Sequence, residues 1–148
     1  MGDKLKKVAI KLLGRREYSS FELKNKLLER GFDGQQIKLL LAELVLNNWQ
    51  SDQRFAESYV RSRKYRGIGP LKLTLELEQR GITRDEIKGL IASAEQNWEQ
   101  LAIEVSQKKF GKIKPKEIKE LARRVNYLLA RGFTVDQARQ AVNYEETL

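Results

Sequence analysis

The sequence predicts an all-α protein that consists of three tandem three-helix modules, similar in design to helix-turn-helix repeats. The first observation is a short junction that recurs: "LLERGFD" at 27–33 returns as "LEQRGIT" at 77–83 and as "LLARGFT" at 128–134. The second is a helical pattern of apolar residues after each junction. The third is a residue suited to an N-cap, which lies between the glycine of the junction and the helix that follows. Because repetition at a fixed period is typical of repeat proteins, we divide the chain into modules at 4–48, 52–95 and 97–144.

Each junction has the features of one helix ending and another beginning. Its glycine suits the left-handed residue that closes a helix, and the arginine before it places a cation at the negative end of the helix dipole. An Asp or Thr follows as N-cap, with Gln or Glu three residues later, which is a capping box. These residues are Arg30, Gly31, Asp33 and Gln36, then Arg80, Gly81, Thr83 and Glu86, then Arg131, Gly132, Thr134 and Gln137.

The last helix of each module carries apolar residues at i, i+3 and i+4, which predicts one buried face. They are Ile37, Leu40 and Leu41, then Ile87, Leu90 and Ile91, then Ala138, Ala141 and Val142. The first helices align in the same way, and a small alanine recurs where two helices would approach closely. This alanine is Ala9 in the first module, Ala56 in the second and Ala102 in the third.

The middle helices are expected to begin near Ser20, Pro70 and Pro115, since proline suits a first helical turn. Ser19 with Glu22 is a further capping box. By this count the third middle helix is six residues longer than the second.

The stretch "LKLTLELE" at 71–78 alternates like a strand. Its alignment with the helix of the first module predicts a helix instead, with Leu75 exposed or packed between modules. Trp49 and Trp98 lie at similar module boundaries, and burial between modules is the expected role of both.

Composition excludes several classes of function. The chain of 148 residues has no cysteine and no histidine, which removes disulfides, thiolate metal sites and the commonest general base. Its acidic residues are not spaced as a metal cluster, and phosphate-binding and nucleophile motifs are absent. We therefore expect a binding protein rather than an enzyme, with no cofactor and no metal. Without a long apolar run or a signal-peptide pattern, the expected location is the cytoplasm, with no membrane contact.

A net charge of +9, from 29 basic and 20 acidic residues, predicts a polyanionic partner, either nucleic acid or an acidic protein surface. The densest basic stretch is "RSRKYRGIGPLK" at 61–72, where Tyr65 lies among the cations. Basic residues mixed with an aromatic ring suit phosphate contacts combined with base stacking. Equivalent stretches are Arg15-Arg16 and "KKFGKIKPK" at 108–116. If the modules follow a steady rotation, these stretches form a basic stripe along one side of an elongated molecule.

Several stretches resemble a known family. "DQRFAESYVRSR" at 52–63, followed by "GIGP" at 67–70 and "LKLTLELEQRGI" at 71–82, is similar to the RecX regulators of RecA recombinase, as is "SSFELKNKLLERGFD" at 19–33. The resemblance covers almost the whole chain. It implies an elongated, curved helical protein that lies in the groove of the RecA–single-stranded DNA filament. It also implies inhibition of the RecA ATPase, of strand exchange and of filament growth, and so a role in recombinational DNA repair.

With this resemblance, we expect a monomer that contacts the RecA filament and single-stranded or double-stranded DNA through basic side chains. The central contact is assigned to Arg61, Arg63, Lys64, Arg66 and Lys72. It extends on one side to Arg15, Arg16 and Lys24, and on the other to Lys108, Lys109, Lys112, Arg123 and Arg124. Asp52 and Phe55 are assigned to the fold, as N-cap and core, while Arg54 and Tyr59 fit either role.

Two other functions remain open. A direct DNA-binding protein of the helix-turn-helix type, without a RecA partner, would present its last helices to the groove, where Lys38, Lys88 and Arg139 offer one cation each. That number is small for reading bases. A protein-only adaptor would need an exposed apolar groove.

Overall fold

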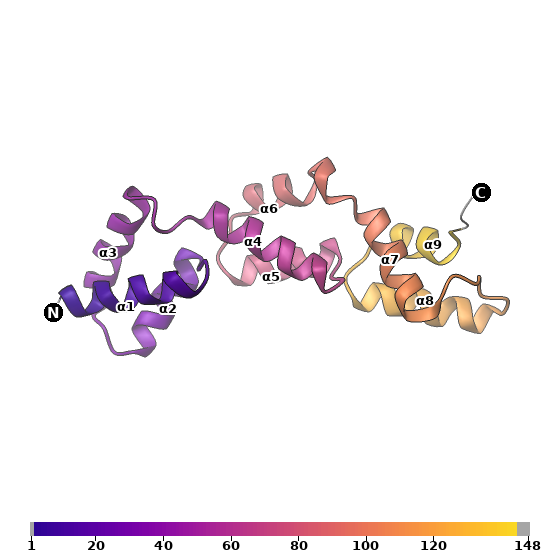
Figure 1. The fold of residues 1–148 in the computed structure, drawn as a ribbon, viewed down its shortest axis with the longest axis horizontal. Coiled ribbons are helices and arrows are strands. Elements are labelled where there is room, and N and C mark those ends of the chain that lie inside the picture. Colours follow the sequence, from indigo (N-terminus) through magenta and orange to yellow (C-terminus); the bar gives the residue numbers. More distant parts are fainter. Residues whose placement is uncertain (1, 145–148) are drawn as a thin grey trace. The chain divides into compact units, whose positions relative to one another are not determined.

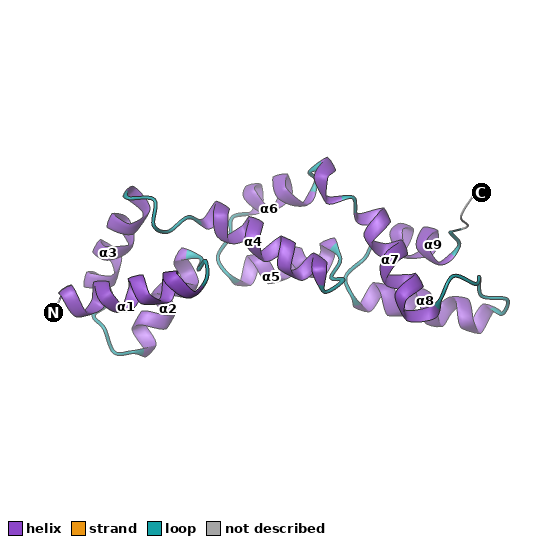
Figure 2. Ribbon diagram, viewed as in Figure 1, coloured by secondary structure: helices purple, strands orange, loops and turns teal. Residues whose placement is uncertain are grey.

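A computed structural model describes residues 2–144, and this part of the chain forms nine α-helices, one short 3₁₀ helix and no β-strand (Figures 1 and 2). The all-α prediction is confirmed. The first three helices are α1 (Gly2–Arg15), α2 (Ser20–Glu29) and α3 (Gly34–Leu46). The next are α4 (Asp52–Tyr65), α5 (Pro70–Gln79) and α6 (Arg84–Ile91), followed by η1 (Ala94–Gln96). The last three are α7 (Trp98–Phe110), α8 (Ile118–Ala130) and α9 (Val135–Val142).

The recurring junction closes α2, α5 and α8 in the same way. Gly31, Gly81 and Gly132 have φ angles of 87°, 81° and 98°, in the left-handed region. The amide of each glycine donates to the carbonyl three residues earlier, and the next amide donates to the carbonyl five residues earlier, as in a Schellman motif. The residue after the glycine is apolar each time, and in the third junction this residue, Phe133, is fully buried in one cluster with Leu128.

The helix starts also follow the local prediction. Ser19 and Thr134 form complete capping boxes, in which the side chain caps a backbone amide and the third helical residue returns the hydrogen bond. The side chains of Asp33 and Thr83 each accept a hydrogen bond from the amide three residues later. Each junction therefore satisfies the polar groups of both helix ends with neighbouring residues.

The described residues divide into two compact units, and the division runs through α4 and α5. The first unit comprises residues up to 59 together with 77–87. Its main apolar cluster lies between α1, α2 and α3, and the predicted alanine Ala9 is fully buried in it. The cluster is formed by Leu5, Ala9, Leu12, Tyr18, Leu23, Leu27, Ile37, Leu40 and Leu44.

The second unit comprises residues 60–76 and the chain from residue 88 onward. Helices α7, α8 and α9 pack together in it, and Ala102 is fully buried as predicted. Its main cluster is formed by Ala102, Leu128, Phe133, Ala138, Ala141 and Val142. Within residues 2–144, the helices are too short or too polar to cross a membrane.

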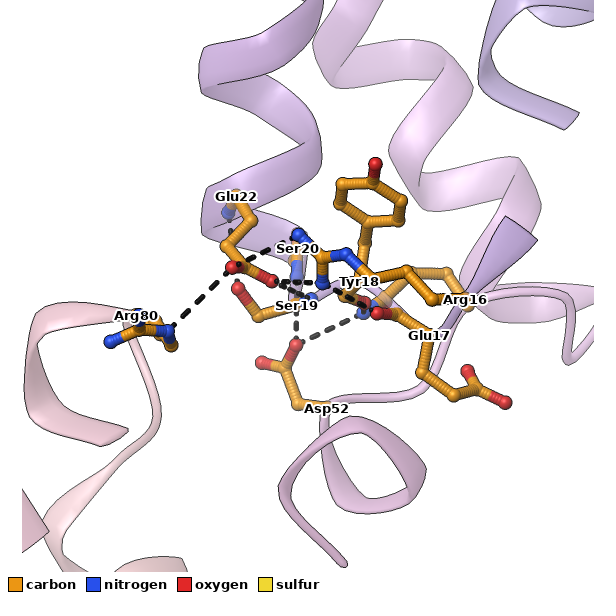
Figure 3. A network of polar contacts seen from close by, with 9 residues as sticks. Arg16, Glu17, Tyr18, Ser19, Ser20, Glu22, Asp52 and Arg80 are labelled. Carbon is orange, nitrogen blue, oxygen red and sulfur yellow. Dashed lines mark hydrogen bonds and ion pairs between the residues drawn. The ribbon is translucent and has the colours of Figure 1, made fainter. Parts of the chain in front are cut away.

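Asp52 has a different role from the predicted one. Helix α4 begins at Asp52, and Ser51 rather than Asp52 accepts the capping hydrogen bond, from the Arg54 amide at 3.2 Å. The Asp52 carboxylate instead accepts a hydrogen bond from the amide of Ser20, at 2.8 Å, and so caps the start of α2 (Figure 3). The N-cap assignment was wrong because a carboxylate at the start of one helix can reach the free amides of another. Phe55 is buried, as predicted.

Residues 71–78 are helical, and Leu75 is 59% exposed, so the alignment with the first module was the better guide. Pro70 is the first residue of α5, as predicted, but α8 begins only at Ile118, three residues beyond Pro115. Helix α8 is therefore three residues longer than α5 rather than six, with 13 residues against 10. Proline tolerates a first helical turn without enforcing one, and the exposed side chains at 116–119 add no packing that would hold a further turn.

The two tryptophans differ. Trp98 is buried, as predicted, and its indole donates a hydrogen bond to the Ile91 carbonyl at 2.8 Å. Trp49 is 51% exposed, so its predicted burial was wrong. It follows Asn48, which takes a left-handed conformation with φ of 62°, and the turn leaves the indole half outside.

Two of the three arginine–glycine turns dock on the first turn of an earlier helix. We call Arg30–Gly31, Arg80–Gly81 and Arg131–Gly132 the RG turns. In the first unit, Gly81 lies against Phe21 of α2, so closely that an added Cβ would be 2.5 Å from the Phe21 Cβ. The Arg80 guanidinium reaches Glu22 of the same helix, with 3.7 Å between Nε and Oε2 (Figure 3).

In the second unit, the Arg131–Gly132 turn docks on the start of α5. The amides of Gly69 and Leu71 donate to the carbonyls of Arg131 and Gly132, both at 2.8 Å. A Cβ added to Gly132 would lie 2.4 Å from the Cβ of Lys72. The free amides of a helix N-terminus are thus satisfied by the carbonyls of a later turn.

Candidate functional site

Basic and aromatic side chains from α4, α7 and α8 surround a pocket of about 580 Å³ in the second unit. Four of the predicted contact residues line it, namely Lys64, Arg66, Lys108 and Lys109. Arg131 adds a fifth cation, whereas Glu104 is the single acidic residue in the lining. Cations from three separate parts of the sequence, at 64–66, 108–109 and 131, therefore share one electropositive site.

The end of α4 forms one wall because two features hold it against α7 and α8. Gly67 takes a left-handed conformation with φ of 78°, and a Cβ there would lie 2.9 Å from Cγ2 of Val105. The Arg131 guanidinium donates to the carbonyl of Gly67, at 3.1 Å, and to the carbonyl of Arg66. A cation therefore caps the negative end of α4, and the same contact fixes the position of Arg66.

The pocket offers free cations beside aromatic rings. Arg66 and Lys108 are exposed, and neither side chain makes an ion pair within residues 2–144. Tyr65 is 94% exposed, and the Tyr127 ring lies 5.5 Å from the Lys109 ammonium. Such a surface can bind phosphates through its cations and stack bases on its rings, which suits single-stranded nucleic acid.

Two predicted contact residues have structural partners. Arg63 donates two hydrogen bonds to the Glu76 carboxylate, at 2.9 Å and 2.8 Å, and both side chains are largely buried. Lys64 donates to the backbone and side-chain oxygens of Gln96, at 2.6 Å and 3.0 Å. Burial lowers the pKa of Lys64 below its ordinary value. These two cations hold helices together, which leaves Arg61, Arg66 and Lys72 as the exposed cations of the stretch at 61–72.

The other predicted residues are mostly exposed. This holds for Arg61, Lys72, Arg15, Lys24, Lys108, Lys109 and Lys112. Arg16 is exposed as well, but its guanidinium donates to Glu22 at 3.1 Å and lies 3.7 Å from the centre of the Tyr18 ring. Of the two residues that fitted either role, Arg54 donates to Glu17 at 3.2 Å and Tyr59 lies 4.6 Å beneath the Arg80 guanidinium.

Arg123 and Arg124 share one carboxylate. Both donate to Glu120, at 2.9 Å and 3.0 Å, and both lie over the Phe110 ring. These hydrogen bonds lower the pKa of Glu120 from 4.5 to about 2. The hydrogen bond from Arg123 has the larger effect, followed by that from Arg124. The pair therefore carries less free positive charge than the sequence suggests.

This cluster gives a pH-dependent contribution to stability. Because the pKa of Glu120 is lower in the folded state, about 2 against 4.5, the ionised carboxylate stabilises the fold above pH 4.5. The contribution is lost as the pH falls from 4.5 toward 2. We expect the free energy of unfolding of Glu120→Gln to lack this component. Titration of the Glu120 carboxyl by NMR checks the cause, and a midpoint at the ordinary value would contradict it.

Sequence reasoning missed Arg131 and Tyr127 as parts of the site. Arg131 was assigned only to the end of its own helix, and its reach to the end of α4 depends on tertiary packing. A faint signal was present, since arginine recurs before the glycine in all three junctions. No comparable pattern marks Tyr127. Lys38, Lys88 and Arg139, the cations of the direct DNA-binding alternative, are exposed.

The fold and the site define a class of protein: a repetitive all-helical binding protein with an electropositive, aromatic-lined surface. Within residues 2–144, no cluster of potential metal ligands is present. Three family models match this chain in order. The models of the first, second and third three-helix domains of RecX match residues 6–44, 51–89 and 97–142.

Individual relatives agree with these matches. The regulatory protein RecX of Legionella pneumophila is 38% identical over 128 residues, which are 86% of this chain and 85% of that protein. The regulatory protein RecX of Vibrio parahaemolyticus is 35% identical over 141 residues, 95% and 91% of the two chains. The crystal structure of RecX from Lactobacillus salivarius has the same fold, with a TM-score of 0.77, 18% identity and coverage of 95% and 94%. The chain belongs to the RecX family, whose similar members are named regulatory proteins rather than enzymes.

Proposed function

We propose that this chain regulates RecA recombinase in the cytoplasm. In this proposal it binds the RecA filament on single-stranded DNA and inhibits ATP hydrolysis, strand exchange and filament growth, which modulates recombinational DNA repair. The observation that carries the proposal is the match to all three RecX domains in their order along the chain. The action is one of binding, without chemistry of its own.

The charge of the molecule supports a contact with both DNA and an acidic protein surface. The net charge is +9, and exposed cations occur in the first, second and third groups of helices. The pocket between α4, α7 and α8 adds aromatic rings to these cations. Several weak contacts on one chain give strong overall binding when they engage neighbouring sites of a filament.

The direct test is ATP hydrolysis by RecA on single-stranded DNA while this protein is titrated. We expect inhibition at concentrations well below that of RecA, because a chain bound to the filament affects more than one subunit. Binding to naked single-stranded DNA is measured in parallel, across a range of salt concentrations. Inhibition that appears only when the protein covers the free DNA supports the direct DNA-binding alternative instead. An unchanged ATPase at every ratio contradicts the proposal.

A further inference from the structure

The remaining RG turn, Arg30–Gly31, has no helix docked on it within residues 2–144. Gly31 is left-handed like its two counterparts, yet a Cβ added to it would have no atom within 4 Å. Arg30 is exposed. Beside the turn lies a pocket of about 660 Å³, to which Lys4, Val8 and Phe32 contribute. A docked junction has two halves, the RG turn and the first turn of the helix on which it docks. Arg80–Gly81 and Arg131–Gly132 are docked RG turns, whereas the first unit exposes Arg30–Gly31 as an undocked one.

The other half of such a junction is exposed at the start of α8. In both docked junctions the RG turn meets the first turn of a middle helix. Within residues 2–144 no RG turn docks on the first turn of α8, and Ile118 there is 85% exposed. Its N-cap residue, Glu117, makes no side-chain capping hydrogen bond. The free amides of this turn are thus available for carbonyl acceptors.

The acidic and basic side chains at the two exposed halves correspond to those of one docked junction, that of Arg80–Gly81 with α2. Arg80 reaches Glu22, which is the third residue of α2. The third residue of α8 is also a glutamate, Glu120, and the undocked RG turn offers Arg30. Glu120 already accepts hydrogen bonds from Arg123 and Arg124. Glu22 likewise accepts from Arg16 and is still reached by Arg80. Lys4 lies beside the Arg30–Gly31 turn, and Lys119 lies in the first turn of α8. These two like charges repel each other, so the attraction between the halves comes from the Arg30–Glu120 pair and not from their overall charge.

We propose that the Arg30–Gly31 turn of one copy docks on the first turn of α8 of a second copy. The carbonyls of the turn accept hydrogen bonds from the free amides of α8. In the same way, the carbonyls of Arg131 and Gly132 accept hydrogen bonds from the amides of Gly69 and Leu71. Arg30 pairs with Glu120, and Ile118 enters the pocket beside the turn. Each copy carries one free half of either kind, so every contact joins two unlike surfaces. It does not depend on RecA or DNA.

The contact is weak between separate chains. Inside one chain the two halves of a junction are linked, which corresponds to an effective concentration in the millimolar range. Separate copies lack this advantage, so we expect a monomer in dilute solution and association at chain concentrations of roughly 0.1 mM and above. Neighbouring copies on a long polyanion would reach such concentrations locally.

A pair of charge reversals tests the proposal, with sedimentation equilibrium as the measurement. Arg30→Glu blocks one half of the contact and Glu120→Arg blocks the other. We expect each variant alone to remain monomeric at concentrations where the wild type associates. An equimolar mixture is expected to associate again, because native halves meet at one contact and reversed charges meet at the next. Association through a surface that contains neither residue would give no such rescue.

Two further variants control for effects on folding. Lys26→Glu makes the same charge change at the same end of α2 and is expected to associate like the wild type. In Gly31→Asn, the asparagine tolerates the left-handed conformation, but its side chain occupies the surface on which the second copy would dock. This variant is expected to abolish association. A wild type that stays monomeric at every concentration overturns the proposal. So does association that persists in Arg30→Glu, which would point to another surface, such as the exposed Leu39 and Leu46 of α3.

Discussion

Replacing Gly132 by alanine is expected to lower the free energy of unfolding by roughly 2–5 kcal/mol, whereas the same change at Gly31 should cost roughly 1–2 kcal/mol. Both glycines are left-handed, with φ of 98° and 87°, so both variants bear the cost of that conformation. At Gly132 the new methyl group would also lie 2.4 Å from the Cβ of Lys72 and 2.8 Å from its amide nitrogen. The turn and the start of α5 must then separate, which weakens the hydrogen bonds between them.

Urea unfolding followed by far-ultraviolet circular dichroism and by tryptophan fluorescence measures this difference. Trp98 is buried in the same unit as Gly132, so its fluorescence reports the unit that is affected. Gly31→Ala is the matched control, because nothing lies within 4 Å of the added methyl group. Gly81→Ala should resemble Gly132→Ala, since its methyl group would lie 2.5 Å from Phe21. Equal losses at all three positions would show that the turns only close helices and dock nothing.

The second large effect concerns inhibition of RecA. A triple variant with Arg66, Lys108 and Lys109 changed to alanine is expected to need at least a tenfold higher concentration for half inhibition. These side chains are exposed cations that line one pocket, and none of them holds two helices together through an ion pair in the described part of the chain. If the three contact phosphates, the salt dependence of binding to single-stranded DNA should weaken by about 2 in logarithmic slope, since each contact contributes about 0.7.

The chain offers a matched control for this variant. Lys38, Lys88 and Arg139 are three exposed cations on the last helices of the three groups, and their removal changes the net charge equally. We expect this control triple to inhibit RecA like the wild type. The reverse result, with the control impaired and the pocket variant intact, would favour the direct DNA-binding alternative. Arg63→Ala and Lys64→Ala are unsuitable as contact tests, because both side chains bond to other parts of the fold.

The helices and their junctions could be predicted from the sequence because the determining interactions are local. A left-handed glycine, a capping box and the apolar face that follows it all lie within a few residues of one another. Because the pattern occurs three times, each helix assignment could be compared with the equivalent residues of the other two modules. This comparison assigned residues 71–78 to a helix although apolar and polar residues alternate there as in a strand. The failures at Pro115 and Asp52 occurred where a local rule permits two outcomes.

The candidate site depended more strongly on tertiary structure. In the stretch Arg61 to Arg66 the sequence shows four equivalent cations, but partners 13 and 32 residues further along the chain, Glu76 and Gln96, engage two of them.

By itself, the sequence determined the all-helical class, the three junctions, the excess of positive charge and the resemblance that the family models confirm. Only the tertiary structure decided which cations stay exposed, which turns dock and where Arg131 reaches. The physical reason is that helix ends and helical faces are governed by contacts one turn apart, whereas the pairing of a long cationic side chain depends on which helix packs beside it.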